Sequence, residues 1–152
     1  MKFGQESTMT KDTLKIQNYN SLEDTLKHIK EVKSIIDLFI FELERRKINH
    51  DISKLSKIEK SFFDEFTPKL WNLTYGSLEY KKTLEKLKPA LDHHYKNNRH
   101  HPEHFKNGIN DMNLIDVIEM FSDWLAATKR HANGDIIKSI EINKDRFKNL
   151  DN

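Results

Sequence analysis

The 152-residue sequence contains no cysteine, only four glycines and only three prolines. The lack of cysteine excludes disulfides and thiolate metal sites, so any metal ion must be bound by imidazole and carboxylate groups. The sparse glycines form no phosphate-cradling loop, and the motifs Gly-x-Ser-x-Gly and Gly-x-x-x-x-Gly-Lys are both missing. These two motif-based routes to hydrolysis and phosphate binding are therefore excluded.

Long apolar runs and a large excess of one charge are missing too. No apolar stretch approaches the roughly 20 residues that a membrane-spanning helix needs, and the first five residues carry no apolar signal core. The formal net charge of +2 is too small for a nucleic-acid-binding surface. We expect a soluble cytoplasmic protein, in the host cytoplasm if a phage encodes it, without membrane or extended nucleic-acid partners. Whether it forms a homo-oligomer stays open.

Helical periodicity is what the sequence does contain. Apolar residues recur at helical spacing and predict a long amphipathic helix over about residues 21–47, and no stretch alternates with the period of a strand. Further helices are predicted from helix-start and helix-stop residues. The predicted starts are at Ser56, after Thr67-Pro68, at Ser77, at Asn113 and at Asp135. The helix from Asn113 is predicted to end near His131. Stops are predicted at Gly76 and Gly134, and a break or kink at Pro89. The pattern predicts an all-α fold, a single bundle of about six to seven helices over residues 20–150, after a flexible arm at 1–19.

The His50-Asp51 pair places an imidazole beside a carboxylate, and two such groups can bind one cation together. On the preceding helix His28 borders the apolar stripe, and Asp24, four residues earlier, shares its face and can orient the imidazole. Lys54 lies three residues after the aspartate, where it can face a phosphate oxygen. For His28 the alternative is a hydrogen-bonded core histidine, or a surface ion pair with Asp24 on the helix. For His50-Asp51 the alternative is an ordinary surface dipeptide, and for Lys54 it is a solvated lysine.

Five of the eight histidines fall within residues 93–104. A solvated loop does not need this density of imidazoles, so the run predicts a metal site. Either an adventitious metal-binding patch or a pH-sensitive surface would be the alternative. Lys96 and Arg99 lie among the histidines and can neutralise an anionic substrate.

Asp116, Glu119 and Asp123 follow one another at spacings of three and four and therefore share a helix face, which Arg130 continues. Apolar residues cover most of the rest of this helix. The pattern favours a buried helix with its acidic side toward a polar site, where a cation, the arginine or the histidines compensate the carboxylates. A solvent-facing acidic stripe is the alternative.

Taken in order, His28, the His50-Asp51 pair and Asp123 resemble the HD-domain superfamily of metal-dependent phosphohydrolases. That family places a histidine, a His-Asp pair and a distant aspartate on an all-helical fold, and His-Asp-Ile-Ser-Lys is similar to its His-Asp-x-x-Lys pattern. The sequence is also similar, over about residues 22–147, to a family of short, largely uncharacterised phage and bacterial proteins. The shared wording is His-Asp-x-Ser-Lys, His-His-x(5)-His-His and Glu-Met-Phe-x-Asp-Trp-x-Ala-Ala.

The later histidines resemble the two-metal branch of the HD superfamily, in which a lone histidine and a His-His pair precede the last aspartate. His94, or equally His93, matches the lone histidine. The resemblance implies an HD-like bundle that binds one or two divalent ions, chosen from Mn, Fe, Co, Ni, Zn and Mg. The implied metal ligands are His28, His50, Asp51, His94, His100, His101 and Asp123, supported by Asp24 and Glu119; Lys54, Lys96 and Arg99 would bind phosphate, and Asp51 and Lys54 would take part in catalysis.

Three functions are consistent with such a site. The first is a metal-dependent phosphohydrolase in which a metal-bound water attacks a nucleotide or another small phosphate ester. The second is a di-iron oxygenase, because some members of the superfamily use this ligand set to activate oxygen. The third is a protein that binds a nucleotide or another ligand without turning it over.

Overall fold

The structure, a computed structural model, describes residues 19–74, 77–129 and 134–147. These residues form five α-helices, three short 3-10 helices and no strand, which confirms the predicted all-α fold with a helix count just below the prediction. The predicted arm lies outside the described residues except for Tyr19. The elements are α2 (Ser21–Asn49), η1 (Ile52–Leu55), α3 (Lys57–Trp71), α4 (Leu78–Asn97), η2 (Pro102–His104), η3 (Gly108–Asp111), α5 (Leu114–Thr128) and α6 (Ile136–Phe147).

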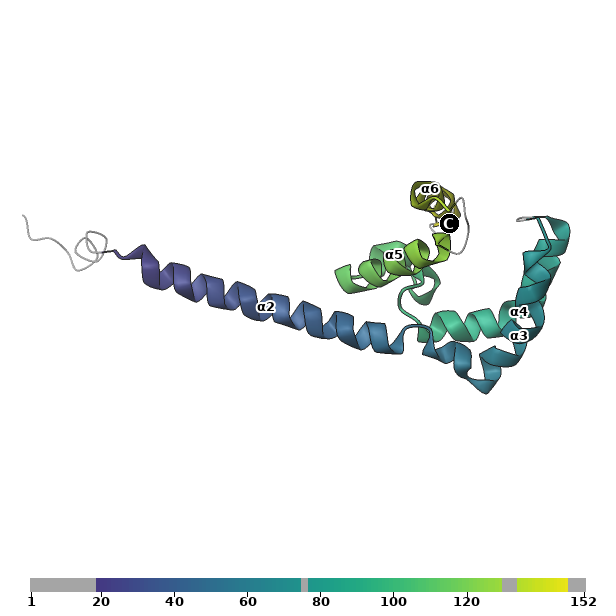
Figure 1. The fold of residues 1–152 in the computed structure, drawn as a ribbon, viewed down its shortest axis with the longest axis horizontal. Coiled ribbons are helices and arrows are strands. Elements are labelled where there is room, and N and C mark those ends of the chain that lie inside the picture. The colour runs from purple at the N-terminus through teal and green to yellow at the C-terminus, as the bar shows by residue number, and fades with distance from the viewer. Residues whose placement is uncertain (1–18, 75–76, 130–133, 148–152) are drawn as a thin grey trace, which may run out of the picture. The chain divides into compact units, whose positions relative to one another are not determined.

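The chain divides into two compact units, Met1–Ile40 and Phe41–Asn152. Helix α2 is the predicted long amphipathic helix (Figure 1); it begins where Asn20 Oδ1 accepts the Leu22 N–H. Its residues 21–40 belong to the first unit, where every side chain is exposed. Its last turns belong to the second unit, which also contains all the other helices.

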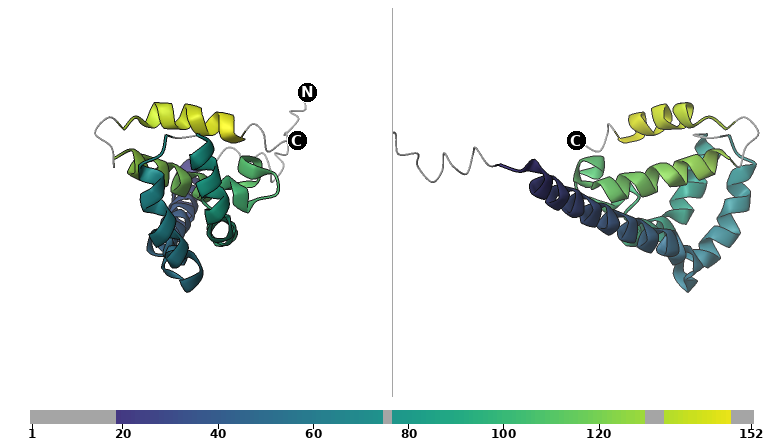
Figure 2. Two further views of the ribbon diagram at one scale, coloured as in Figure 1. Left: turned by 90° about the vertical axis from the view of Figure 1, so that its right-hand side faces the viewer. Right: turned by 60° about the vertical axis from the view of Figure 1, so that its left-hand side comes forward.

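The second unit has its apolar core between α3 and α4, which lie side by side (Figures 1 and 2). Ser56 and Ser77 cap these helices as predicted, each accepting a backbone N–H three residues on. Buried Phe66, Leu87 and Ala90 form the centre of the core, because they recur on the facing sides of the two helices. The partly buried residues around them are Phe62, Phe63, Leu70, Leu84 and Leu91.

Pro68 and Pro89 both lie inside helices. A new helix was predicted after Thr67-Pro68, which is wrong because α3 continues through this proline. Of the break or kink predicted at Pro89, the break is excluded because α4 continues to Asn97. A proline inside a helix costs about 3 kcal/mol through a lost hydrogen bond and a steric clash. Burial of apolar side chains next to both prolines, such as Phe66 and Ala90, offsets that cost. The joining of two predicted helices into α3 accounts for the lower helix count.

Helix α5 packs on α6 (Figure 2) and begins with a capping box in which Asn113 and Asp116 exchange side chain–backbone hydrogen bonds. It ends at Thr128, three residues before the predicted end. Asp135 starts α6 as predicted, because its Oδ1 accepts the N–H groups of Ile137 and Lys138. The predicted stops at Gly76 and His131, and Arg130, lie outside the described residues. No helix within the described ranges is long and apolar enough to span a membrane.

Candidate metal centre

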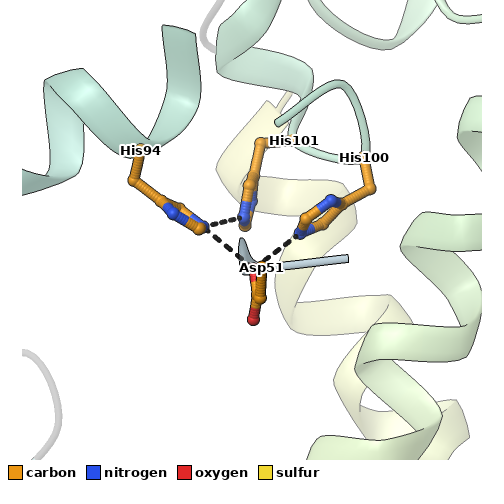
Figure 3. Close-up of side chains that lie close together, drawn as sticks. All are labelled: Asp51, His94, His100 and His101. Carbon is orange, nitrogen blue, oxygen red and sulfur yellow. Dashed lines mark hydrogen bonds and ion pairs between the residues drawn. The ribbon is translucent and has the colours of Figure 1, made fainter. Parts of the chain in front are cut away.

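Asp51 occupies a strained turn between α2 and η1. Its φ of 58° makes it the one non-glycine residue with positive φ in the described part of the chain. This left-handed conformation is unfavourable for most L-residues, although aspartate and asparagine tolerate it best. Strain of this kind persists where surrounding contacts hold it, which is common at functional sites. The turn directs the Asp51 carboxylate toward several imidazoles (Figure 3).

Asp51, His94, His100 and His101 form the first group of ligand atoms (Figure 3). Asp51 Oδ1 lies 3.2 Å from His94 Nε2 and 3.5 Å from His100 Nε2, and His94 Nε2 lies 3.0 Å from His101 Nε2. Two ligand atoms that each lie about 2.0–2.1 Å from one metal ion are separated by about 3.0–3.4 Å. The four side chains therefore have the spacing of a metal coordination shell.

Three buried atoms in this group lack the hydrogen bonds that buried polar atoms normally make. Asp51 Oδ1 and both ring nitrogens of His100 are buried and have no hydrogen-bond partner among the described residues. Leaving such atoms unpaired costs about 1–3 kcal/mol each. A cation between Asp51 Oδ1 and His100 Nε2 would satisfy these two atoms, so the donor set fits a metal ion.

His50, Asp51 and Asp123 form the second group. His50 Nε2 lies 3.7 Å from Asp51 Oδ2 and 3.7 Å from Asp123 Oδ1. The two oxygens of Asp51 thus face different imidazole sets, Oδ1 toward the first group and Oδ2 toward the second. A carboxylate in this position can bridge two ions.

Glu59 and Glu119 contact the Nδ1 atoms of three of these histidines. His94 Nδ1 lies 2.9 Å from Glu59 Oε2, His50 Nδ1 lies 3.0 Å from Glu119 Oε1, and His100 Nδ1 lies 3.2 Å from the same oxygen. A carboxylate beside Nδ1 favours the tautomer with its proton there and the lone pair on Nε2. All three imidazoles therefore present Nε2 to Asp51, which is the arrangement that a metal ligand needs.

The loop after α4 brings the adjacent histidines into the first group. Asn98 Nδ2 donates to the backbone oxygen of His94 and to Ser53 Oγ, both at 2.7 Å, and so ties the start of the loop to η1. His101 has an extended backbone, which is the conformation that a residue before proline favours. The end of α4 and the loop after it therefore place three imidazoles around the Asp51 carboxylate. The three histidines lie within eight residues of one another in the sequence.

The electrostatics of the centre suit cation binding. Hydrogen bonds to Asp123 and Glu119 raise the pKa of His50 to about 10, so a metal ion must displace its proton at neutral pH. Burial, with the neighbouring His100 and His94, lowers the pKa of His101 to about 3 and keeps that imidazole neutral. Burial alone would raise the pKa of the Asp51 carboxyl, but contacts with His100, His94 and Lys54 outweigh it and hold that pKa far below the usual range.

Most of the predicted ligands meet in this centre, namely His50, Asp51, His94, His100, His101 and Asp123. His28 and Asp24 are exposed on α2 in the first unit, and His28 belongs to none of the ligand groups found among the described residues. Their role stays a prediction. Sequence reasoning did not assign Glu59 to the centre. Its place in the first turn of the helix that follows the His50-Asp51 stretch is the signal that could have identified it.

The predicted phosphate-binding cations have different surroundings. Lys54 Nζ lies 2.6 Å from Asp51 Oδ2, at the edge of the metal centre. Arg99 donates from Nε and Nη2 to the two oxygens of buried Asp116, at 3.0 and 2.9 Å, so it already neutralises a carboxylate. Lys96 is exposed on α4. Of the three, Lys54 is the one directly beside the ligand atoms.

The choice between His93 and His94 can be tested by mutation. Only His94 faces Asp51, whereas His93 Nδ1 lies 2.6 Å from Glu59 Oε1 and is absent from the ligand groups. We expect His94→Ala to weaken binding of cobalt at least about 10-fold, because a ligand is lost. His93→Ala should change it less than about threefold. Calorimetric titration measures both affinities, and the reverse order would contradict the placement of His94.

A family model matches residues 17–152 and so includes every residue of the metal centre. The chain belongs to DUF5662, a family of unknown function. Comparison with curated proteins and with solved structures yields no significant match. The function of this DUF5662 chain therefore has to be argued from its metal centre.

Proposed function

We propose that the protein is a metal-dependent phosphohydrolase that acts on a nucleotide or another small phosphate ester. The observation that carries the proposal is the position of Asp51, whose two oxygens face two different sets of imidazole and carboxylate ligands. Such pairs of adjacent metal sites are typical of phosphatases and nucleases. The residues of the two groups follow the HD-like order in the sequence, except that His28 belongs to neither group.

The donor set favours transition metals. Three imidazoles and one carboxylate form the first group, and imidazole suits Mn, Fe, Co, Ni or Zn, whereas Mg prefers oxygen ligands and bound water. A divalent ion bound here would polarise a phosphoryl oxygen and bring the pKa of water close to neutrality. Glu59 and Glu119 lie beside Nδ1 of these imidazoles and so orient Nε2 toward Asp51.

A pocket beside the second group provides room for the organic part of a substrate. It encloses about 410 Å³ between the end of α2 and α5, within the range of small-molecule sites. His50, Asp123 and Glu119 contribute polar groups to its wall. Apolar, polar and charged side chains complete the lining: Leu43, Ile118, Ala126, Ser122, Glu44, Arg46 and Lys47.

Lys54 supports a phosphate-binding role for the centre. Its ammonium lies against Asp51 Oδ2, on the side of that carboxylate that faces His50. A flexible lysine in this position can turn to a phosphate oxygen and stabilise charge that develops there. We infer that it contacts the phosphoryl group, while the pocket beside His50 accepts the remainder of the substrate.

The test is a phosphate-release assay on protein first stripped with a chelator. We expect the stripped protein to be inactive against a panel of nucleotides and simple phosphate esters, and one or more of Mn, Fe, Co, Ni and Zn to restore release of phosphate. The loaded protein should contain one or two ions per chain. Full metal loading with no release from any substrate would contradict hydrolysis, and a metal-dependent uptake of oxygen would favour the oxygenase.

A further inference from the structure

The first unit exposes a continuous apolar stripe along α2, here called the α2 stripe. Its members are Leu22, Leu26, Ile29, Val32, Ile36, Phe39 and Ile40. Their exposed fractions run from 40% for Val32 to 60% for Leu22. Soluble monomers rarely expose apolar patches beyond about 300–600 Å², and larger patches mark interaction surfaces.

The size of the α2 stripe matches half of a protein–protein interface. With about half of each side chain exposed, the seven residues present roughly 700 Å² of apolar surface. Two such surfaces in contact would bury roughly 1,400 Å², which lies within the range of stable specific interfaces. A patch of this size on a single helix is therefore large enough for association by itself.

The spacing within the α2 stripe indicates what covers it. Leu22, Ile29 and Ile36 repeat every seven residues, as do Leu26 and Ile40 with Lys33 between them. Together these positions form a continuous seam of the kind that packs against another helix with the same repeat. A second copy of this chain has the same repeat. Two-fold symmetric pairing of one patch with itself is also the commonest form of protein assembly.

Lys33 is the one polar residue in this seam between Leu22 and Ile40. A single lysine at such a position is tolerated in paired helices, because its stem packs along the seam while its ammonium reaches water. Such a lysine lowers the stability of the helix pair but restricts the register in which two helices can pair. The opposite side of the helix carries the exposed apolar residue Leu38, which provides a matched comparison.

We propose that this chain forms a homodimer in which the α2 stripes of two copies pack against each other. The proposal does not depend on the metal centre or on phosphohydrolase activity. Light scattering on the full chain should give twice the 18.1 kDa of a single copy. Ile36→Glu should reduce the mass to that of one copy, whereas Leu38→Glu, the same kind of change on the opposite face, should leave the dimer intact.

Cysteine cross-linking keeps the proposal testable if Ile36→Glu also melts the helix. Because the chain has no cysteine, paired substitutions carry the only thiols. Ile29→Cys with Ile40→Cys should give a covalent dimer under mild oxidation for either orientation of the two helices. Glu31→Cys with Leu38→Cys, on the opposite face, should not. A monomeric wild-type protein, equal effects of the two glutamate variants, or equal cross-linking of the two cysteine pairs would overturn the proposal.

Discussion

Replacing Asp51 with asparagine is expected to weaken metal binding at least about 100-fold and to reduce the proposed phosphohydrolase activity on the order of 10³-fold or more. The change removes the negative charge and replaces one carboxylate oxygen with an amide nitrogen that cannot bind a metal ion. Because Oδ1 faces His94 and Oδ2 faces His50, both ligand groups lose an atom or its charge at once. No other residue among the described ligands belongs to both of these groups.

Asparagine is the appropriate substitution because of the turn. Asp51 has a φ of 58°, and asparagine adopts this region readily, whereas alanine would add backbone strain to the loss of a ligand. Asp64→Asn is the control, because Asp64 is exposed and pairs with Lys60 at 2.6 Å on α3. Metal content by mass spectrometry, calorimetric affinity and phosphate release should all change in the first variant only. An Asp51→Asn protein with unchanged metal affinity would contradict the bridging position.

Replacing Arg46 with leucine is expected to destabilise the metal-free protein by about 3–5 kcal/mol. The guanidinium donates from Nη2 to Asp116 Oδ1 at 2.6 Å and from Nη1 to Glu119 Oε2 at 2.7 Å. Both carboxylates and the arginine are largely removed from water, with Asp116 fully buried. Leucine would leave these two charges without one of their main partners, and an uncompensated buried charge is costly.

Arg45→Leu is the matched control, because the neighbouring side chain is exposed and pairs with Glu42 at 2.9 Å on the same helix. Exposed pairs of this kind contribute about 0.2–1 kcal/mol. Urea unfolding at neutral pH, in the presence of a chelator, measures the free energy of unfolding of both variants. Equal stabilities for the two proteins would show that the network of Arg46, Asp116 and Glu119 does not support the fold.

This network also explains how the centre keeps its shape before a metal binds. Burial alone would raise the pKa of the Glu119 carboxyl, but contacts with His100, His50 and Arg46 outweigh it and hold that pKa well below its usual range. Arg99 secures Asp116 from the other side, and Asp116 in turn belongs to the capping box that starts α5. The helix start and the ligand support therefore share one carboxylate.

Local signals predicted the helices well, because capping is a short-range effect. Ser56, Ser77 and Asn113 accept hydrogen bonds from N–H groups three residues on, and such contacts need no tertiary partner. The prediction at Pro68 was wrong for the opposite reason. Whether a helix survives Pro68 or Pro89 depends on burial of the neighbouring side chains, which a local pattern does not contain.

The residues of the candidate centre likewise fall into those that the sequence predicted and those that only the structure identified. The resemblance and the density of histidines predicted six residues that the structure brings together as candidate ligands. They did not predict Glu59, whose role comes from the packing of α3 against α4 and the resulting approach to His93 and His94. They proposed Arg99 as a phosphate-binding cation, and the structure shows that this side chain pairs with Asp116. Nor did they distinguish His93 from His94, since adjacent residues on a helix differ only in direction.

By itself, then, the sequence determined the all-helical class, most helix starts and the chemical nature of the ligands, because these follow from residue type and short-range spacing. Only the tertiary structure decided which oxygen of Asp51 faces which histidines, which carboxylates stand behind the imidazoles and which arginine is already paired. Those properties depend on distances between residues far apart in the chain. Such distances are set by packing, which periodicity along one segment does not encode.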